Sequence, residues 1–434
     1  MAAPARNYFY TTAGYGGLMS RSFAHSLNLW LDMPRIRRIA VIWCLVAPIL
    51  LVIYLAMQRQ VGLTDGNDRP FGEDFLNFWS AARLAISGRA TLIYDLRLFH
   101  DFQQAVVGGP IDLYHYSYPP VMLLLTAPIG LLPYEAGWLV WQVGGWLAFA
   151  LAVRRIAPSN WFLLALAPPA ILINAIGGQN GCWIAAVLGW GLILLERRPM
   201  LAGAILALLV VKPQLAWLVP LALLAGREYR AVAALCLTAV LLIMLSLVIF
   251  GIDLWLAYAA QGAMLKTVIL ENGWGTWHRM ISAFVLVRHL DAAVAVAYAA
   301  QVLVSAVVAW LVLARWRTDG ATPTSFAMLL LGVLLGSIYV SDYDCVSVAL
   351  VLAWAWPVLR ADGLWRSALA VLTPLLAAPL AVASGVALGA FMLWPLFLSI
   401  RRKAVANRAC QASMLRPSEA FTNPPSTVIV SPTT

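Results

Sequence analysis

Long apolar runs, separated by short polar or basic turns, occupy almost the whole chain. The first run, Arg38 to Met57, is too long for the core of a signal peptide and no small-residue cleavage site follows it. It therefore predicts an uncleaved membrane anchor. Most later runs approach the roughly 20 residues that a helix needs to cross a bilayer. Further runs are Gly137 to Val153, Trp161 to Ala175, Cys182 to Glu196, Met200 to Val211, Leu215 to Ala225, Val232 to Phe250, Ala292 to Ala314, Phe326 to Val340, Cys345 to Leu359, Leu364 to Ala381 and Val386 to Ile400.

These runs predict an all-α polytopic membrane protein with about 12 transmembrane helices. The runs Met200 to Val211 and Leu215 to Ala225 are too short to cross upright, and they predict a thin helical pair. The apolar run Val121 to Leu132 lies between prolines and predicts a short interfacial helix. Counting it as a span would invert the sidedness of every later basic cluster.

Composition and charge agree with this class. Hydrophobic residues make up 62% of the chain, charged residues 11%, and the mean hydropathy is +0.82, which excludes an ordinary soluble protein. The net charge of +10 lies mainly in Lys and Arg clusters beside the ends of apolar runs. That placement indicates cytoplasmic loops, and no nucleic-acid partner is expected.

The basic clusters also predict the organisation of the chain. Residues 1–34 are expected to form a cytoplasmic N-terminal segment, and residues 35–403 a single membrane domain. Within that domain, 58–135 and 251–290 are the two large external loops, the first of which carries short interfacial helices. Residues 404–434 are rich in Pro, Ser and Thr towards their end and predict a disordered cytoplasmic tail.

With this topology, nearly all unexplained polar residues lie on the external side. A transporter or flippase of a lipid-linked sugar is the alternative, but it should concentrate polar groups near the midplane of the membrane. One-sided polarity indicates a reaction at the external face. The candidate site residues are Asp74, Asn77, Tyr94, Tyr118, Gln179, Asn180, Lys212, Gln214, Trp277, His278, Arg279, Asp342 and Asp344.

Asp74 is the candidate general base. It precedes an aromatic helix in the first external loop, where a substrate would arrive from outside. The alternative role for its carboxylate is to cap that helix. Its neighbour Glu73 would point elsewhere and is expected to be a supporting or solvated charge.

Three cations are candidates for binding a donor phosphate, namely Lys212, His278 and Arg279. Lys212 stands alone between two apolar runs and is followed by Pro213; its alternative is to snorkel to the interface. The turn at residues 177–181 could bring backbone N–H groups to an anion, or serve only as a flexible connection. Sugar or acceptor contacts are expected from Asn77, Tyr94, Tyr118, Gln179, Asn180, Gln214, Trp277, Asp342 and Asp344.

Some of these side chains have structural alternatives. Tyr118 precedes two prolines and could belong to a rigid, extended segment. Trp277 could belong to an interfacial aromatic belt. One of Asp342 and Asp344 is expected to cap the helix that follows.

An acid, several cations and aromatic rings on one membrane face suit glycosyl transfer from a lipid phosphate sugar. The phosphate leaves as a weakly basic anion, so one carboxylate that takes the proton of the acceptor hydroxyl suffices. Metal assistance would need Asp74 to converge with Asp342 or Asp344. No metal site is predicted, because hard cations prefer several clustered oxygens and the sequence shows no such cluster. No cofactor is expected, and the spacing of the five cysteines predicts no structural disulfide.

Six short motifs follow one another along the chain: Asp74-Phe-Leu-Asn-Phe-Trp79, Gly88-Arg-Ala-Thr-Leu-Ile-Tyr94-Asp95, Tyr118-Pro-Pro120, Gly178-Gln-Asn180, Lys212-Pro-Gln214 and Asp342-Tyr-Asp344. In this order they resemble the bacterial members of glycosyltransferase family 87. The similarity extends from about Asp74 to Val351.

The resemblance implies a GT-C fold in the bacterial inner membrane, with the active site on the periplasmic or external side. It also implies a polyprenyl-phosphate sugar donor, with mannose as the best-known sugar, a lipid or glycan acceptor, and Asp74 as the base. The identity of the acceptor does not carry over. A non-catalytic membrane scaffold stays open as a third alternative, and it predicts that Asp74, Lys212 and His278 do not converge.

Overall fold

The computed structural model describes residues 34–359 and 364–414, in which every regular element is helical and extended residues form only isolated bridges. The η elements are 3₁₀ helices except η4, which is a π-helix. The elements are α2 (Pro34–Met57), α3 (Phe75–Ile86), η1 (Ala90–Leu92), α4 (Leu96–Val107), α5 (Val121–Thr126), η2 (Ala127–Leu131), α6 (Tyr134–Ile156), α7 (Trp161–Leu166), α8 (Pro169–Ile176), α9 (Gly181–Leu194), α10 (Pro199–Leu206), η3 (Ala207–Val211), α11 (Pro213–Ala216), α12 (Leu218–Ala225), α13 (Tyr229–Leu265), η4 (Lys266–Glu271), η5 (Trp277–Arg279), α14 (Ala283–His289), α15 (Val294–Asp319), α16 (Pro323–Gly336), η6 (Asp342–Ser347), α17 (Val348–Leu359), α18 (Leu364–Ser384), α19 (Gly389–Met392) and α20 (Trp394–Met414).

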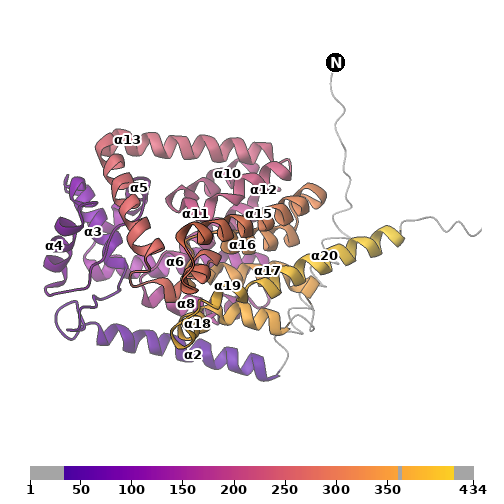
Figure 1. The fold of residues 1–434 in the computed structure, drawn as a ribbon, viewed down its shortest axis with the longest axis horizontal. Helices are drawn as coiled ribbons and strands as arrows, with labels where there is room; N and C mark the ends of the chain where they lie inside the picture. The colour runs from indigo at the N-terminus through magenta and orange to yellow at the C-terminus, as the bar shows by residue number, and fades with distance from the viewer. Residues whose placement is uncertain (1–33, 360–363, 415–434) are drawn as a thin grey trace, which may run out of the picture.

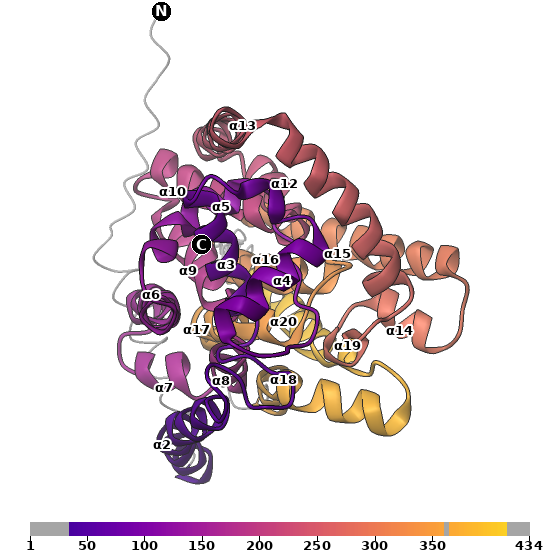
Figure 2. The ribbon, with the colours of Figure 1, turned by 90° about the vertical axis from the view of Figure 1, so that its left-hand side faces the viewer.

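The long helices run roughly along one axis of the molecule, and the short helices of the first loop gather at one end of it (Figure 1). Helices α3, α4 and α5 lie in front when that end faces the viewer, with the second part of α13 beside them (Figure 2). The start of α2 and the end of α20 lie at the opposite end. An even number of membrane crossings predicts that the first and the last helix have their outer ends on the same side, as these two do.

Six helices in the described ranges are long and apolar enough to cross a membrane. They are Arg37–Met57, Tyr134–Ile156, Tyr229–Glu271, Val294–Asp319, Asp342–Leu359 and Trp365–Ser384. Five shorter apolar helices accompany them, at Val121–Leu131, Gly181–Leu194, Pro199–Val211, Pro213–Ala225 and Pro323–Gly336. The protein is therefore a multi-pass membrane protein, while the number of about 12 crossings stays a prediction.

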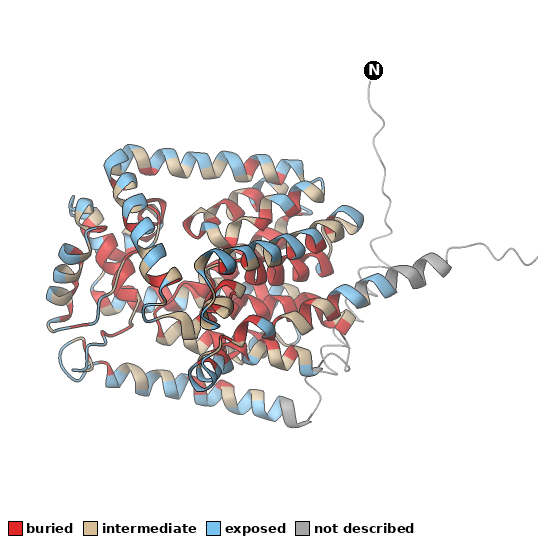
Figure 3. Cartoon of the chain, viewed as in Figure 1, coloured by how far each residue is buried: buried red, intermediate tan, exposed pale blue. Residues whose placement is uncertain are grey.

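Apolar side chains cover both the outside and the inside of this bundle. Only 11% of the most apolar window of α2 is buried, against 89% for Asp342–Leu359. Figure 3 shows the same contrast, with exposed residues along α2, α13 and α15 and buried residues in the centre. A helix that is hydrophobic all round is stable only in a core or in lipid, so the outer faces of α2, α13 and α15 are suited to acyl chains.

Proline and glycine explain where the expected spans differ from the observed helices. The run Trp161 to Ala175 forms two short helices, α7 and α8, because Pro168 and Pro169 interrupt the backbone hydrogen bonds between them. The run Val232 to Phe250 continues as α13 to Leu265, but it turns sharply at Gly251, whose φ is +79°. After that turn, α13 runs across the end of the molecule where the first loop lies (Figure 2).

The apolar run predicted as a short interfacial helix forms α5 and η2. This segment packs against α3: the indole Nε1 of Trp79 donates to the carbonyl of Leu132 over 3.0 Å, and Arg83 donates to the carbonyl of Gly130 over 3.2 Å. These two contacts hold the middle and the last turn of α3 against the end of this segment.

The two ends of the chain lie largely outside the described residues. This applies to 1–33 of the expected N-terminal segment and to 415–434 of the expected tail. Helix α20 continues to Met414, so the first part of the tail predicted as disordered is helical.

The contact between α10 and α13 leaves no room for a side chain at Gly203. A Cβ there would lie 2.0 Å from the carbonyl oxygen of Ala231, whereas a Cβ on Gly262 would meet nothing within 4 Å. Gly203→Ala is therefore expected to lower the free energy of unfolding by about 1–3 kcal/mol. Gly262→Ala should raise it by up to about 1 kcal/mol, because alanine favours helix. Thermal unfolding of both variants in detergent checks this; equal midpoints would contradict the packing.

Candidate active site

One cavity of about 150 Å³ lies among the loop ends near α3. Its walls come from the start of α3, the segment before α5, the turn before α9, the turn before α11, the second part of α13, the loop before η5 and the segment before η6. The lining residues are Asp74, Asn77, Phe78, His115, Ser117, Tyr118, Gln179, Val211, Lys212, Pro213, Gln214, Tyr258, Thr276, Arg279, Tyr339, Ser341 and Tyr343. Seven of the sequence-predicted residues, which lie far apart along the chain, therefore meet in one place: Asp74, Asn77, Tyr118, Gln179, Lys212, Gln214 and Arg279.

Asp74 occupies the position before α3, but its side chain accepts no hydrogen bond from the free N–H groups of that helix. Two amides hold the carboxylate instead. Asn77 Nδ2 donates to Asp74 Oδ1 over 3.1 Å, and Gln179 Nε2 donates to Asp74 Oδ2. The capping alternative is thus not met, and the carboxylate is oriented towards the cavity.

A buried glutamine lies behind this arrangement. Gln103 of α4 is fully buried, and its Nε2 donates to Asn77 Oδ1 over 2.9 Å. Since the oxygen of Asn77 faces Gln103, its amide nitrogen faces Asp74. The chain of contacts from Gln103 to Asn77 to Asp74 fixes the carboxylate from one side.

The surroundings of Asp74 raise its pKa to about 6. Burial is the largest cause, because it disfavours the charged form, and the nearby charges of Glu73 and Asp342 act in the same direction. Arg279 and the hydrogen bond from Gln179 oppose the shift. A carboxylate with such a pKa is ionised at neutral pH and can still accept a proton readily.

The turn Gly177 to Gly181 joins the two halves of the site. At Gly178, whose φ is +60°, a Cβ would lie 2.0 Å from the carbonyl oxygen of Gly72. At Gly181 a Cβ would lie 2.4 Å from the carbonyl oxygen of Tyr343. The turn therefore fits between the Asp74 loop and the η6 segment only because both positions are glycine.

Two buried amides, Asn174 and Gln142, support this turn. Asn174 Nδ2 donates to Gln142 Oε1 over 3.2 Å, and Asn174 Oδ1 accepts from the backbone N–H of Cys182 over 3.3 Å. Gln179 thus projects from a rigid base towards Asp74.

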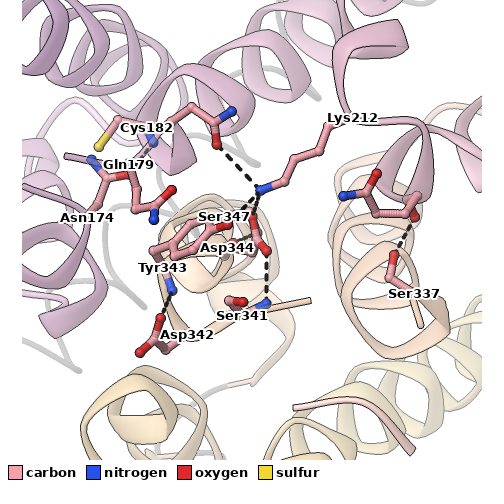
Figure 4. A network of polar contacts seen from close by, with 12 residues as sticks. Asn174, Gln179, Cys182, Lys212, Ser337, Ser341, Asp342, Tyr343, Asp344 and Ser347 are labelled. Atoms are coloured by element: carbon pink, nitrogen blue, oxygen red, sulfur yellow. Dashed lines mark hydrogen bonds and ion pairs between the residues drawn. The ribbon is translucent and has the colours of Figure 1, made fainter. Parts of the chain in front are cut away.

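Lys212 lies deep in the wall of the cavity, with 2% of its surface exposed. Its Nζ lies 2.5 Å from Asp344 Oδ1, 3.4 Å from Asn180 Oδ1 and 3.5 Å from the hydroxyl of Tyr343 (Figure 4). The expected alternative of a snorkelling lysine is wrong, because burial and the ion pair hold the ammonium inside. Asp344 also accepts from the backbone N–H of Ser341 over 3.0 Å, which makes it the acid that caps η6.

Arg279 forms the second ion pair of the site. Its Nε and Nη2 donate to the two oxygens of Asp342 over 2.9 Å and 3.1 Å. Among the described residues, none accepts from Nη1, and 29% of the Arg279 side chain is exposed. Arg279 therefore keeps donor capacity towards the cavity, whereas the acceptors around Lys212 already surround its ammonium.

Six predicted residues do not line the cavity. Asn180, Asp342 and Asp344 lie one layer behind it, as partners of the two cations. Tyr94 donates its hydroxyl to the carbonyl of Tyr118 over 2.7 Å, so it supports the wall.

Trp277 and His278 are the two predicted residues that the structure leaves aside. Trp277 stacks near His289 and under Arg288 and donates its Nε1 to the carbonyl of Leu270. His278 is half-buried beside Arg279, and burial followed by the charge of Arg279 lowers its pKa. The 3₁₀ turn of η5 directs Arg279 to the cavity and its two preceding side chains elsewhere.

Several lining residues lay beyond the sequence-based prediction. Tyr258 arrives from the second part of α13, in the stretch predicted from the sequence to form the second external loop. Tyr339 and Ser341 come from the extended segment after α16. His115, in the segment before α5, also lines the cavity. Burial lowers its pKa to about 4, so its imidazole is neutral at pH 7.

The model of glycosyltransferase family 87 matches residues 116–341, more than half of the chain. The chain belongs to glycosyltransferase family 87. The match is narrower at both ends than the range from Asp74 to Val351 that the motifs predicted. It includes Tyr118, Gln179, Lys212 and Arg279, but it begins after Asp74 and so does not include the proposed base. No curated protein and no solved structure matches the chain.

Membership of this family identifies the protein as a membrane glycosyltransferase, as the sequence predicted. The transporter alternative and the scaffold alternative are therefore set aside. Asp74 and Lys212, two of the three residues whose convergence was in question, do line one cavity, and His278 lies next to its wall.

The buried pair of Lys212 and Asp344 yields a prediction about stability. Lys212→Met and Asp344→Asn each leave one buried charge without its partner and should cost about 3–5 kcal/mol of unfolding free energy. The double variant removes both charges and should recover most of that loss. Thermal unfolding in detergent measures all three, and losses that simply add in the double variant would show that the pair is not coupled.

Proposed function

We propose that the protein transfers a hexose from a polyprenyl-phosphate donor to a hydroxyl of a lipid or glycan acceptor, with Asp74 as general base. The observation that carries this proposal is a carboxylate with a pKa of about 6 in the same cavity as an arginine with an uncommitted N–H edge. The site would face the external side of a bacterial inner membrane. That sidedness rests on the basic clusters at the other end of the helices.

The proposed reaction needs a single proton acceptor. The acceptor hydroxyl gives its proton to Asp74, its oxygen forms a bond to C1 of the sugar, and the bond between C1 and the donor phosphate oxygen breaks. Polyprenyl phosphate leaves with the electron pair of that bond. Since a phosphate monoester has a second pKa near 6, the leaving group needs no acid at neutral pH.

Arg279 is the proposed contact for the donor phosphate. Asp342 holds its Nε and Nη2 in a bidentate pair, which fixes the plane of the guanidinium, while Nη1 remains available for a phosphate oxygen. Lys212 contributes positive potential from behind the wall, because its close partners are Asp344, Asn180 and Tyr343. Of the three cations named from the sequence, Arg279 is thus the proposed direct contact to the donor phosphate and Lys212 an indirect contributor. His278 lies beside Arg279 and has no assigned contact.

The proposed sugar site lies between Asp74 and Arg279. Tyr118, Tyr258 and Gln214 line the same cavity and offer aromatic faces and an amide to a hexose. Asn77 and Gln179 are largely occupied in holding Asp74, so they orient the base. Mannose is the proposed sugar on the family resemblance.

Removing the proposed base should abolish transfer without unfolding the protein. Asp74→Asn keeps the shape of the side chain and loses its proton acceptor, so we expect a fall in kcat of about 10²–10⁴-fold. The assay follows release of polyprenyl phosphate from labelled polyprenyl-phosphate mannose, with a bacterial membrane lipid extract as acceptor.

A matched control for this variant lies in the same loop. Asp95 caps α4, accepting from the backbone N–H groups of Arg97 and Leu98, and does not line the cavity. Asp95→Asn should retain activity and lose at most about 1 kcal/mol of stability. Asp74→Asn with full activity would show that another group takes the proton.

The raised pKa of Asp74 predicts the pH dependence of the reaction. The base works in its ionised form, so kcat/KM should be constant above the pKa and fall tenfold per unit as the pH drops below about 6. Gln103→Leu should move this acidic limb to higher pH, because Asn77 is then free to turn its donor away from the carboxylate. An unchanged limb in that variant, with the wild-type limb near 6, would show that Gln103 only fills space.

A further inference from the structure

A second cavity lies at the end of the molecule opposite α3. It has a volume of about 520 Å³ and lies where α12 ends, α13 begins and α15 ends (Figure 1). Its lining residues are Leu221, Leu224, Ala225, Arg227, Tyr229, Leu313 and Arg317. None of them contributes to the proposed glycosyl transfer.

Polarity changes along the axis of this cavity. Leu313 lies one helical turn before Arg317 on α15, further into the bundle, and Leu221 and Leu224 precede the turn that carries Arg227. The leucines on α12 are 40% and 45% exposed. The cavity thus presents apolar side chains on the membrane side and two guanidinium groups at the rim.

The two arginines have no ion-pair partner among the described residues. By contrast, Arg315 on the same helix pairs with Asp319. Glu228 follows Arg227 in sequence, yet within the described part of the chain it forms no ion pair with either guanidinium. Arg227 also has a φ of +62°, a left-handed conformation that is uncommon for a residue with a side chain.

We propose that this cavity binds an anionic phospholipid. The phosphodiester of the headgroup lies between Arg227 and Arg317, and an acyl chain lies against Leu221, Leu224 and Leu313. Guanidinium groups bind phosphate oxygens through paired N–H donors. Basic pockets between transmembrane helices are suited to such headgroups.

Two features favour a lipid over a soluble anion. The apolar wall is continuous with the exposed faces of α12, which a free phosphate would leave uncovered. A lipid already confined to the bilayer also reaches the cavity without leaving the membrane. Basic residues that only establish topology need no shared cavity, whereas these two face one.

The test is native mass spectrometry of the full-length protein after delipidation in detergent. Phosphatidylglycerol and phosphatidylcholine with identical acyl chains are titrated separately, with inorganic phosphate as a third arm. We expect phosphatidylglycerol to bind at least tenfold more tightly than phosphatidylcholine and to raise the thermal midpoint, and inorganic phosphate to do neither. The double variant Arg227→Gln with Arg317→Gln should lose this preference.

Two control variants separate the site from general charge and from misfolding. Arg197→Gln with Arg230→Gln removes the same charge outside the lining and should keep the preference. Arg227→Lys with Arg317→Lys keeps the charge but loses the paired donors, and it should retain part of the binding. Three results would overturn the proposal: equal binding of the two lipids, retention of the preference in the Arg227→Gln and Arg317→Gln variant, or loss of the preference in the Arg197 and Arg230 control. Stabilisation of the protein by inorganic phosphate alone would identify a site for a soluble anion instead.

Discussion

The site depends on a backbone approach that only glycine permits. The turn at 177–181 lies between the loop that carries Asp74 and the segment that carries Asp342 and Asp344, and a side chain at Gly178 or Gly181 would collide with the backbone on either side. Because this turn is held from below by Asn174 and Gln142, the distance between the two segments is fixed. The carboxylate and the cations therefore face one cavity without a flexible connection.

Charge balance is the second constraint on the site. Charges inside a membrane protein are costly, and each of the two cations that line the cavity has its own carboxylate: Lys212 has Asp344, and Arg279 has Asp342. Asp74 has no ion-pair partner among the described residues and is held by neutral amides. Because Lys212 and Arg279 are paired with other carboxylates, the proton affinity of Asp74 is set mainly by burial, and this suits a general base.

The molecule separates its chemistry from its contact with lipid. The cavity is built from loop ends and short helices, whereas α2, the first part of α13 and α15 present apolar faces outwards. Gly251 connects the two roles, because it lets α13 leave the bundle axis and bring Tyr258 over the cavity. A straight helix of the same sequence would place Tyr258 away from the site.

The sequence alone determined the class of the protein, its helical content and the group of polar residues at loop ends, because apolar runs near membrane length have few alternatives in lipid. It also indicated Asp74, Lys212 and Arg279, since charges outside the flanking clusters are rare in such a chain. Tertiary structure decided which of them meet. Gln179 reaches Asp74 across 105 residues and Lys212 reaches Asp344 across 132, and no local pattern encodes such contacts. The side chains of Trp277 and His278 point away from the cavity for the same reason. Their direction is set by the 3₁₀ turn η5 and its packing in the folded protein, whereas their positions in the sequence fit a side chain inside or outside the cavity equally well.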